Sequence, residues 1–134
     1  MKRAGIFRVG AAIGVGVVAG LGLAGCASEG NLKIFAEEQT AEDILPDTGS
    51  WGDTFDVDTS RYLWANDDVT YFAVLSQEGR PCLVIMDPDA GAAGCSTTLP
   101  VEVSNGGPNM MLGDNLPDSS DRWEKVADHL WMEK

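Results

Sequence analysis

The fold class is decided by two runs in the middle of the chain, Val69-Thr70-Tyr71-Phe72-Ala73-Val74-Leu75 and Cys82-Leu83-Val84-Ile85-Met86. Both are rich in β-branched and aromatic residues, and the link Gln77-Glu78-Gly79-Arg80 between them contains a glycine. Two such runs joined by a short link of this kind predict a β-hairpin. Because both runs are apolar on both faces, we expect these strands in the middle of a sheet and not at its edge.

Shorter segments predict further strands on both sides of the hairpin. These segments are residues 61–64, 101–103 and 110–112. An Asn66-Asp67-Asp68 turn is expected to join the first of them to the hairpin. The stretches 47–58 and 90–94 consist mostly of small or polar residues, so we expect loops there, with Trp51 and Phe55 as anchors.

Two segments have features of helices. Residues 37–45 are expected to form about two helical turns, which Pro46 ends. Within residues 121–132, apolar side chains recur at helical spacing and Asp121 with Glu124 is typical of a capping box, which favours a helix over a pair of strands broken near Asp128. The expected fold class is therefore α+β: a small antiparallel β-sheet domain with a short N-terminal helix and a C-terminal helix.

The first 25 residues differ in kind from the rest. Lys2, Arg3 and Arg8 precede an apolar run, residues 9–25, that contains no charged side chain and many glycines. Such a short run is a poor spanning helix for a hydrocarbon core of about 30 Å. A basic start, an apolar middle and small residues at the end are typical of a cleaved signal peptide.

The end of that run, Leu23-Ala24-Gly25-Cys26, resembles the lipobox of bacterial lipoproteins. In that family the cysteine sulfur receives a diacylglycerol and the chain is cut just before the cysteine. The resemblance implies a signal peptide over 1–25, a lipidated tether over 26–34 and one extracytoplasmic domain over 35–134. The partner is then the cell membrane, through a lipid anchor on Cys26. The alternative is an ordinary secretory signal, or an uncleaved anchor, that carries a cysteine.

The region after the signal resembles a group of small exported proteins and lipoproteins of actinobacteria to which no activity is assigned. The residues that carry this resemblance are Gln39-Thr40, Asp43, Leu45-Pro46, Ser60-Arg61, Cys82-Leu83-Val84 and Cys95. The resemblance implies an extracytoplasmic single domain with a paired disulfide, and it carries no catalytic residue.

The cysteine count leads to the same pairing. The chain has three cysteines, and if Cys26 carries lipid, Cys82 and Cys95 remain as a pair in an oxidising compartment. We expect a structural disulfide between them. The alternatives are a metal site, which two cysteines without a nearby histidine do not favour, and a redox pair, which is more often spaced C-x-x-C.

Composition limits the function classes. The chain of 134 residues has 21 acidic and 9 basic side chains, a net charge of −12, and this acidity excludes nucleic acid as a partner. Zinc-finger, P-loop and Rossmann motifs are missing. The leading hypothesis is a non-enzymatic interaction or accessory module of the envelope, without a cofactor and with an envelope protein as partner. The alternative is an envelope hydrolase that acts through carboxylates.

No catalytic or metal site is predicted. His129 is the single histidine and no nucleophile-elbow motif accompanies it, so a solvated or capping role is favoured. Asp53, Asp56 and Asp58 are weak calcium candidates, because an EF-hand loop starting at Asp56 would place Arg61 where glycine is required. Acids that converge in a pocket would favour the hydrolase, whereas an exposed apolar patch would favour the binding module.

Overall fold

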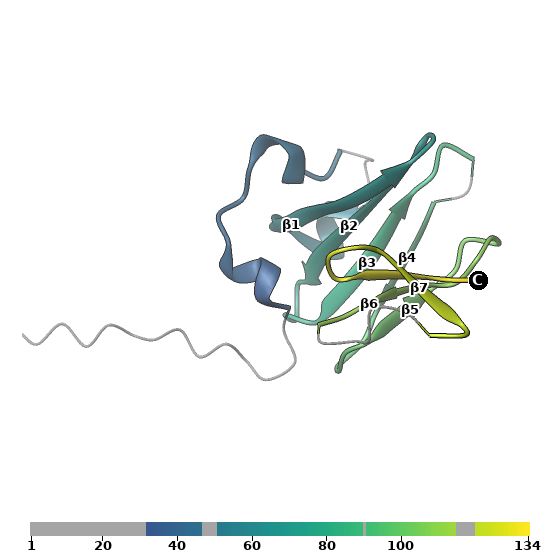
Figure 1. Ribbon diagram of the computed structural model, residues 1–134. Coiled ribbons are helices and arrows are strands. Elements are labelled where there is room, and N and C mark those ends of the chain that lie inside the picture. The colour runs from purple at the N-terminus through teal and green to yellow at the C-terminus, as the bar shows by residue number, and fades with distance from the viewer. Residues whose placement is uncertain (1–31, 47–50, 90, 115–119) are drawn as a thin grey trace, which may run out of the picture.

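A computed structural model describes residues 32–46, 51–89, 91–114 and 120–134, and within these ranges the chain forms two antiparallel four-stranded sheets (Figure 1). The first sheet has the order β1-β2-β3-β4 and the second has the order β5-β6-β8-β7. The strands are β1 Phe55–Asn66, β2 Val69–Ser76, β3 Pro81–Met86, β4 Ala92–Cys95, β5 Val101–Val103, β6 Met110–Leu112, β7 Trp123–Ala127 and β8 Leu130–Glu133. Antiparallel β structure is thus the confirmed part of the fold class.

The predicted hairpin is confirmed as β2 and β3, which are the two central strands of the first sheet. Gly79 has a φ of 80° in the turn between them, a backbone conformation that favours glycine. The predicted strands before and after the hairpin are also present, as parts of β1, β5 and β6.

Two of the expected loops are wrong in part. Strand β1 already begins at Phe55, because Phe55 and Asp56 pair with Ser76 and Leu75 of β2 ahead of the point where the strand ladder is irregular. Residues 92–95 form β4, which pairs with β3 although its side chains are small. In both places backbone pairing, and not side-chain hydrophobicity, decides the structure.

Both helix predictions are wrong. The described residues contain only short 3-10 turns: η1 Lys33–Ala36, η2 Ala41–Asp43 and η3 Trp51–Asp53. Apolar residues are too sparse in 37–45 to support a longer helix, and hydrogen bonds to β1 hold this segment instead. At the C-terminus the chain forms β7 and β8, because His129 takes a φ of 66° that reverses the chain and Leu130 and Trp131 then continue the second sheet beside β6.

The first sheet is buried on both faces. Its inner face and the second sheet share one apolar cluster, to which Leu83 and Ile85 of β3 and Leu112 of β6 belong. Its outer face carries a second cluster, in which Phe72, Val74 and Val84 are covered by Leu45, Phe55 and Trp51. This two-sided burial explains why β2 and β3 are apolar at successive positions.

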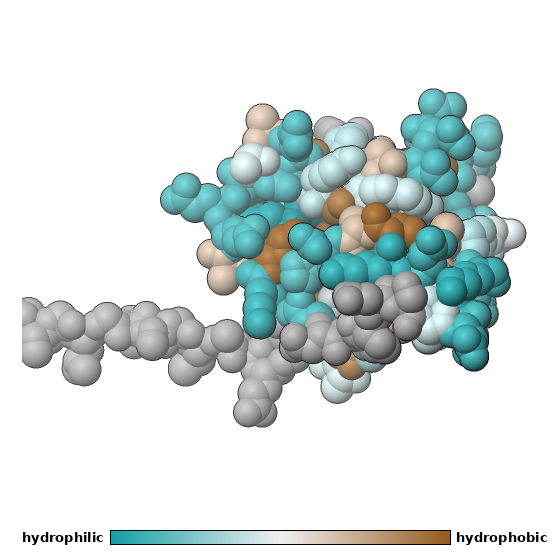
Figure 2. Space-filling view, viewed as in Figure 1, coloured by the Kyte–Doolittle hydropathy of each residue, from teal (hydrophilic) through white to brown (hydrophobic). Residues whose placement is uncertain are grey.

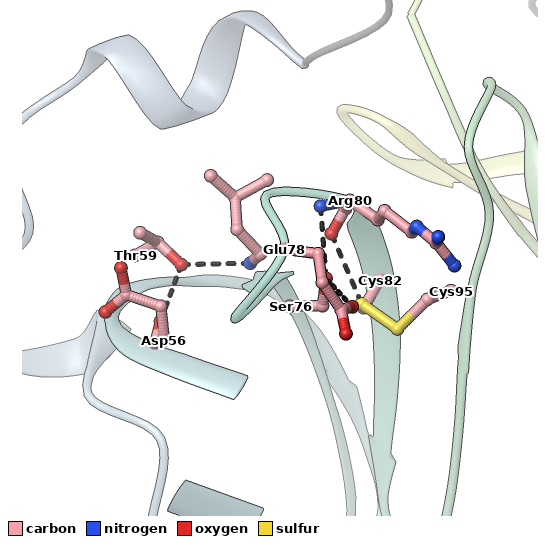
Figure 3. Close-up of a disulfide and its surroundings, with 8 residues drawn as sticks. Asp56, Thr59, Ser76, Glu78, Arg80, Cys82 and Cys95 are labelled. Carbon is pink, nitrogen blue, oxygen red and sulfur yellow. Dashed lines mark hydrogen bonds between the residues drawn. A yellow bond between two sulfur atoms is a disulfide. The ribbon is translucent and has the colours of Figure 1, made fainter. Parts of the chain in front are cut away.

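The predicted disulfide is present and joins β3 to β4 (Figure 3). Cys82 and Cys95 are direct cross-strand partners with their Cα atoms 4.0 Å apart. Cys82 is fully buried, whereas Cys95 is exposed at the edge strand. The bond therefore attaches a short strand of small residues to the centre of the sheet.

The described fold takes in part of the stretch expected to be a tether. Leu32 is 2% exposed and lies in the inner cluster, against which Ile34 also packs. Cys26 lies outside the described residues. Within the described ranges, no helix is long and apolar enough to cross a membrane.

Candidate binding surface

The outer side of the first sheet carries a hollow of about 280 Å³, which we call the Trp51 pocket. Its lining comes from the segment ahead of β1 and from β1 itself, and consists of Gln39, Ile44, Leu45, Pro46, Trp51, Gly52, Val57 and Asp58. Five of these residues are apolar, so the wall is mainly hydrophobic.

Two lining residues are large apolar side chains that the fold leaves exposed. Ile44 is 61% exposed and Val57 is 42% exposed. Trp51 is half-buried, and its ring centroid lies 5.6 Å from that of Phe55. Hydrophilic residues cover most of the face that Figure 2 shows, with small hydrophobic areas between them. A large exposed side chain such as Ile44 beside a hollow is therefore a notable feature of this acidic chain.

Gln39 fixes one wall of the pocket to the edge of β1. Its Nε2 donates to the carbonyl oxygens of Val57 and Ser60, each at 3.1 Å, and to the Ser60 hydroxyl at 3.0 Å. These hydrogen bonds engage the amide nitrogen within the fold. It covers backbone acceptors that an edge strand otherwise leaves unpaired.

The Ser60 hydroxyl is the centre of this attachment. It is 0% exposed, donates to the Asp43 carbonyl oxygen at 2.6 Å and accepts the Leu45 N–H at 3.1 Å in addition to the Gln39 Nε2 bond. A hydroxyl offers one donor and two acceptor positions, and all three are used here. Ser60 therefore connects β1 to both sides of the turn that presents Ile44.

Asp43 holds the same turn from its other side. Its carboxylate accepts the backbone N–H of Thr40 at 2.7 Å, the Thr40 hydroxyl at 2.9 Å and the Tyr62 N–H at 2.8 Å. Burial raises the pKa of this carboxyl, but the hydrogen bonds from Thr40 and Tyr62 together outweigh burial and leave the pKa below its usual value of 3.8.

This lowered pKa predicts a pH-dependent contribution to stability. A depressed folded-state pKa stabilises the protein above the unfolded-state value, and the stabilisation is lost as pH falls through the folded-state value. Asp43→Asn should lower the free energy of unfolding by about 1 kcal/mol at pH 7, as for a lost helix cap, and by much less near pH 2. Urea denaturation at both pH values measures this. An equal loss of unfolding free energy at both pH values would contradict the role of the ionised carboxylate.

The structure brings together most of the residues that carry the actinobacterial resemblance. Gln39, Thr40, Asp43, Leu45 and Ser60 all belong to the network just described. Arg61 lies next to it, is 6% exposed and donates to the Ser60 carbonyl oxygen at 2.8 Å. These residues hold the segment that lines the Trp51 pocket against β1.

The three weak calcium candidates do not form a common site. Asp53 is exposed in η3, Asp56 accepts the Asp58 N–H at 3.3 Å, and Asp58 alone lines the pocket. Among the residues that the structure describes, no group of three or more His, Cys, Asp or Glu side chains could hold a metal ion.

His129 is not among the residues that line this pocket and lies in the turn between β7 and β8. Its Nδ1 pairs with the Asp114 carboxylate, which also accepts the Lys33 N–H at 3.0 Å. The imidazole and Asp114 therefore connect the C-terminal hairpin to the start of the described chain. The role of this arrangement is therefore structural.

Trp51 also borders a second, shallower hollow of about 300 Å³. Its lining consists of Trp51, Thr54, Phe55, Ala93, Gly94 and Cys95, so it reaches the disulfide-linked edge strand β4. Gly94 is required at that strand because a Cβ there would lie 2.7 Å from Cγ2 of buried Val103. The two hollows give Trp51 open space on two sides.

Sequence reasoning did not find the Trp51 pocket. It placed Trp51 as an anchor in a polar stretch, and it placed Ile44 and Leu45 in an expected helix. The signal that points to the site is an isolated pair of apolar residues, Ile44-Leu45, in a strongly acidic segment.

Comparison with known proteins adds no further assignment. No protein-family model matches the chain, no curated protein matches it, and no solved structure matches it.

Proposed function

We propose that this protein is a lipid-anchored domain of the cell envelope that works as a non-enzymatic interaction module. The observation that carries the proposal is the apolar lining of the Trp51 pocket beside the exposed side chains of Ile44 and Val57. Catalysis needs polar groups aimed at a reacting atom, whereas the Gln39 amide nitrogen here is committed to the backbone of β1. Exposed apolar surface beside a hollow is typical of docking sites.

The anchor is supported by the lipobox residues Leu23-Ala24-Gly25-Cys26. Processing there leaves six basic and 21 acidic side chains, a net charge of −15. Two or more acyl chains give stable attachment, while one gives marginal and reversible binding. An acidic domain attached in this way stays off anionic lipid head groups and remains available to a protein partner.

Lipidation predicts a defined chemical form. Mass spectrometry of the membrane fraction should find a mature N-terminus at Cys26 with added acyl mass. Cys26→Ala should leave an unprocessed precursor or release the protein. Unmodified Cys26 in the soluble secreted fraction of the wild type would disprove the anchor and leave the binding surface to be tested separately.

The interaction role predicts a partner at one particular surface. A photo-reactive phenylalanine analogue placed at Ile44 should give a discrete cross-linked species with another envelope protein in intact cells. The same analogue at exposed Thr97, on the link between β4 and β5, serves as control and should not give that species. Val57→Lys should abolish the Ile44 adduct because it puts a positive charge into the apolar lining. Identical adducts from both positions, or none from Ile44, would count against the proposal.

A further inference from the structure

We propose that the Trp51 pocket binds the side chain of a lysine or an arginine that the partner protein presents. This inference rests on the proposed function and adds the chemistry of the partner. It follows from the walls, the charge and the size of the pocket.

The walls fit an aliphatic stem. Ile44, Leu45 and Pro46 line the pocket from the segment ahead of β1, and Val57 lines it from β1. Lysine and arginine bury their methylene stems against apolar surface while the charged end stays in a polar environment. Four aliphatic side chains around one hollow provide such a surface.

The negative charge in the pocket lining is complementary to a cationic side chain. Asp58 is the one charged residue in the described lining, and no described residue forms an ion pair or hydrogen bond with its carboxylate. The nearest basic residue in sequence, Arg61, is buried, and its two terminal guanidinium nitrogens donate to the carbonyl oxygens of Ser60 and Glu37. Gln39 also lines the pocket; its Nε2 donates to β1, and none of the described residues donates to its Oε1, which is a second acceptor in the lining.

Trp51 adds an aromatic wall. An ammonium or guanidinium group over an indole face is attracted by the ring quadrupole, and tryptophan is the best of the aromatic residues for this contact. The indole is half-buried, packs against Phe55 and lines the pocket. An aromatic ring and a carboxylate that no described residue pairs with together distinguish a cation from a neutral apolar side chain.

Size and net charge decide among occupants. About 280 Å³ is below the usual range of roughly 300–1,000 Å³ for drug-sized ligands, so one long side chain suits the hollow better than a larger molecule. A second copy of this chain, or an anionic lipid, would bring negative charge to a chain whose net charge is −12. The same negative net charge favours a basic partner protein.

The test compares two probes of equal stem length. The full-length lipoprotein in a neutral detergent, labelled with 5-fluorotryptophan, is titrated with Nα-acetyl-lysine methylamide and with Nα-acetyl-norleucine methylamide. Fluorine NMR reads the Trp51 signal, which Trp51→Phe assigns. We expect the lysine probe to move this signal and to bind about threefold to tenfold more tightly than the norleucine probe at low salt, with a smaller preference at high salt.

A matched pair of variants locates the preference. Asp58→Asn should weaken binding of the lysine probe about threefold to fivefold and leave the norleucine probe unchanged. Asp89→Asn removes the same charge from an exposed position in the link between β3 and β4 and should leave both probes unchanged. An unmoved signal from buried Trp131 verifies that each variant is folded.

Three outcomes would overturn the inference. Equal affinity for both probes would make the pocket a neutral apolar site. Equal losses in Asp58→Asn and Asp89→Asn would assign the preference to net charge and not to the pocket. No response to either probe would remove the cationic side chain as ligand. In each case the cross-link from Ile44 still decides separately whether the surface binds a partner.

Discussion

Reducing the disulfide between Cys82 and Cys95 should lower the free energy of unfolding by about 2–4 kcal/mol. The bond closes a ring of 14 residues, for which loop entropy alone gives about 3 kcal/mol. Strand β4 consists of Ala92, Ala93, Gly94 and Cys95 and has little side-chain area to hold it against β3. The covalent bond therefore replaces packing that this strand lacks.

The measurement is thermal or urea denaturation of the oxidised and the reduced protein. For a domain of this size we expect a fall in Tm of roughly 8–30 °C. Reduction of the wild type is the sharper test, because it leaves both sulfur atoms in place and creates no cavity. The double variant Cys82→Ala, Cys95→Ala should be insensitive to the reductant. Coincident denaturation curves for oxidised and reduced protein would show that β4 is held without the bond.

Replacing Ser60 by alanine should cost about 2–3 kcal/mol of unfolding free energy, a large effect for the loss of one oxygen atom. The Asp43 carbonyl oxygen and the Leu45 N–H would each lose a buried partner. Leaving one buried polar group unsatisfied costs about 1–3 kcal/mol. Gln39 retains the carbonyl oxygens of Val57 and Ser60 as acceptors, which limits the total loss of unfolding free energy.

Urea denaturation of Ser60→Ala and of Ser104→Ala measures this. Ser104 is an exposed serine between β5 and β6, and its substitution should change stability by less than about 0.5 kcal/mol. Ser60→Ala should also weaken the cross-link from Ile44, because the turn that carries Ile44 loses its attachment to β1. A Ser60→Ala protein as stable as the Ser104→Ala control would show that other contacts hold the turn.

The central hairpin could be predicted because its signal is local. β2 and β3 are continuous apolar runs, and the turn between them contains Gly79, whose positive φ the turn uses. Strand β4 carries no such signal, since its small side chains are placed by backbone pairing and by the disulfide. The pairing of the cysteines, in contrast, followed from counting cysteines in a chain predicted to be exported.

The C-terminal segment shows how a spacing can mislead. Trp123, Val126, Leu130 and Trp131 recur at intervals that suit a helix, yet they lie on two strands. The positive φ of His129 breaks the segment into a hairpin, and β8 then fills the place beside β6 in the second sheet. The pairing of β8 with β6 is a tertiary interaction, and the local spacing of apolar residues carries no information about it.

The Trp51 pocket is tertiary in origin as well. Ile44 and Val57 are 13 residues apart, and they share a pocket because Gln39 and Ser60 join the segment ahead of β1 to the edge of that strand. Each of these polar residues is ordinary in sequence. Only their convergence in the folded chain makes the segment a wall of the pocket.

The buried entry of the chain at Leu32 has a mechanical consequence. A pull on the residues ahead of Leu32 acts first on a side chain in the inner cluster and on the hydrogen bond from the Lys33 N–H to Asp114. Asp114 passes this load to His129, and hence to the second sheet. Gln39 and the turn carrying Ile44 come later in the chain, so the pulling force does not reach them as long as Leu32 stays buried in the inner cluster. The proposed binding surface therefore bears none of the load that the proposed lipid anchor would transmit.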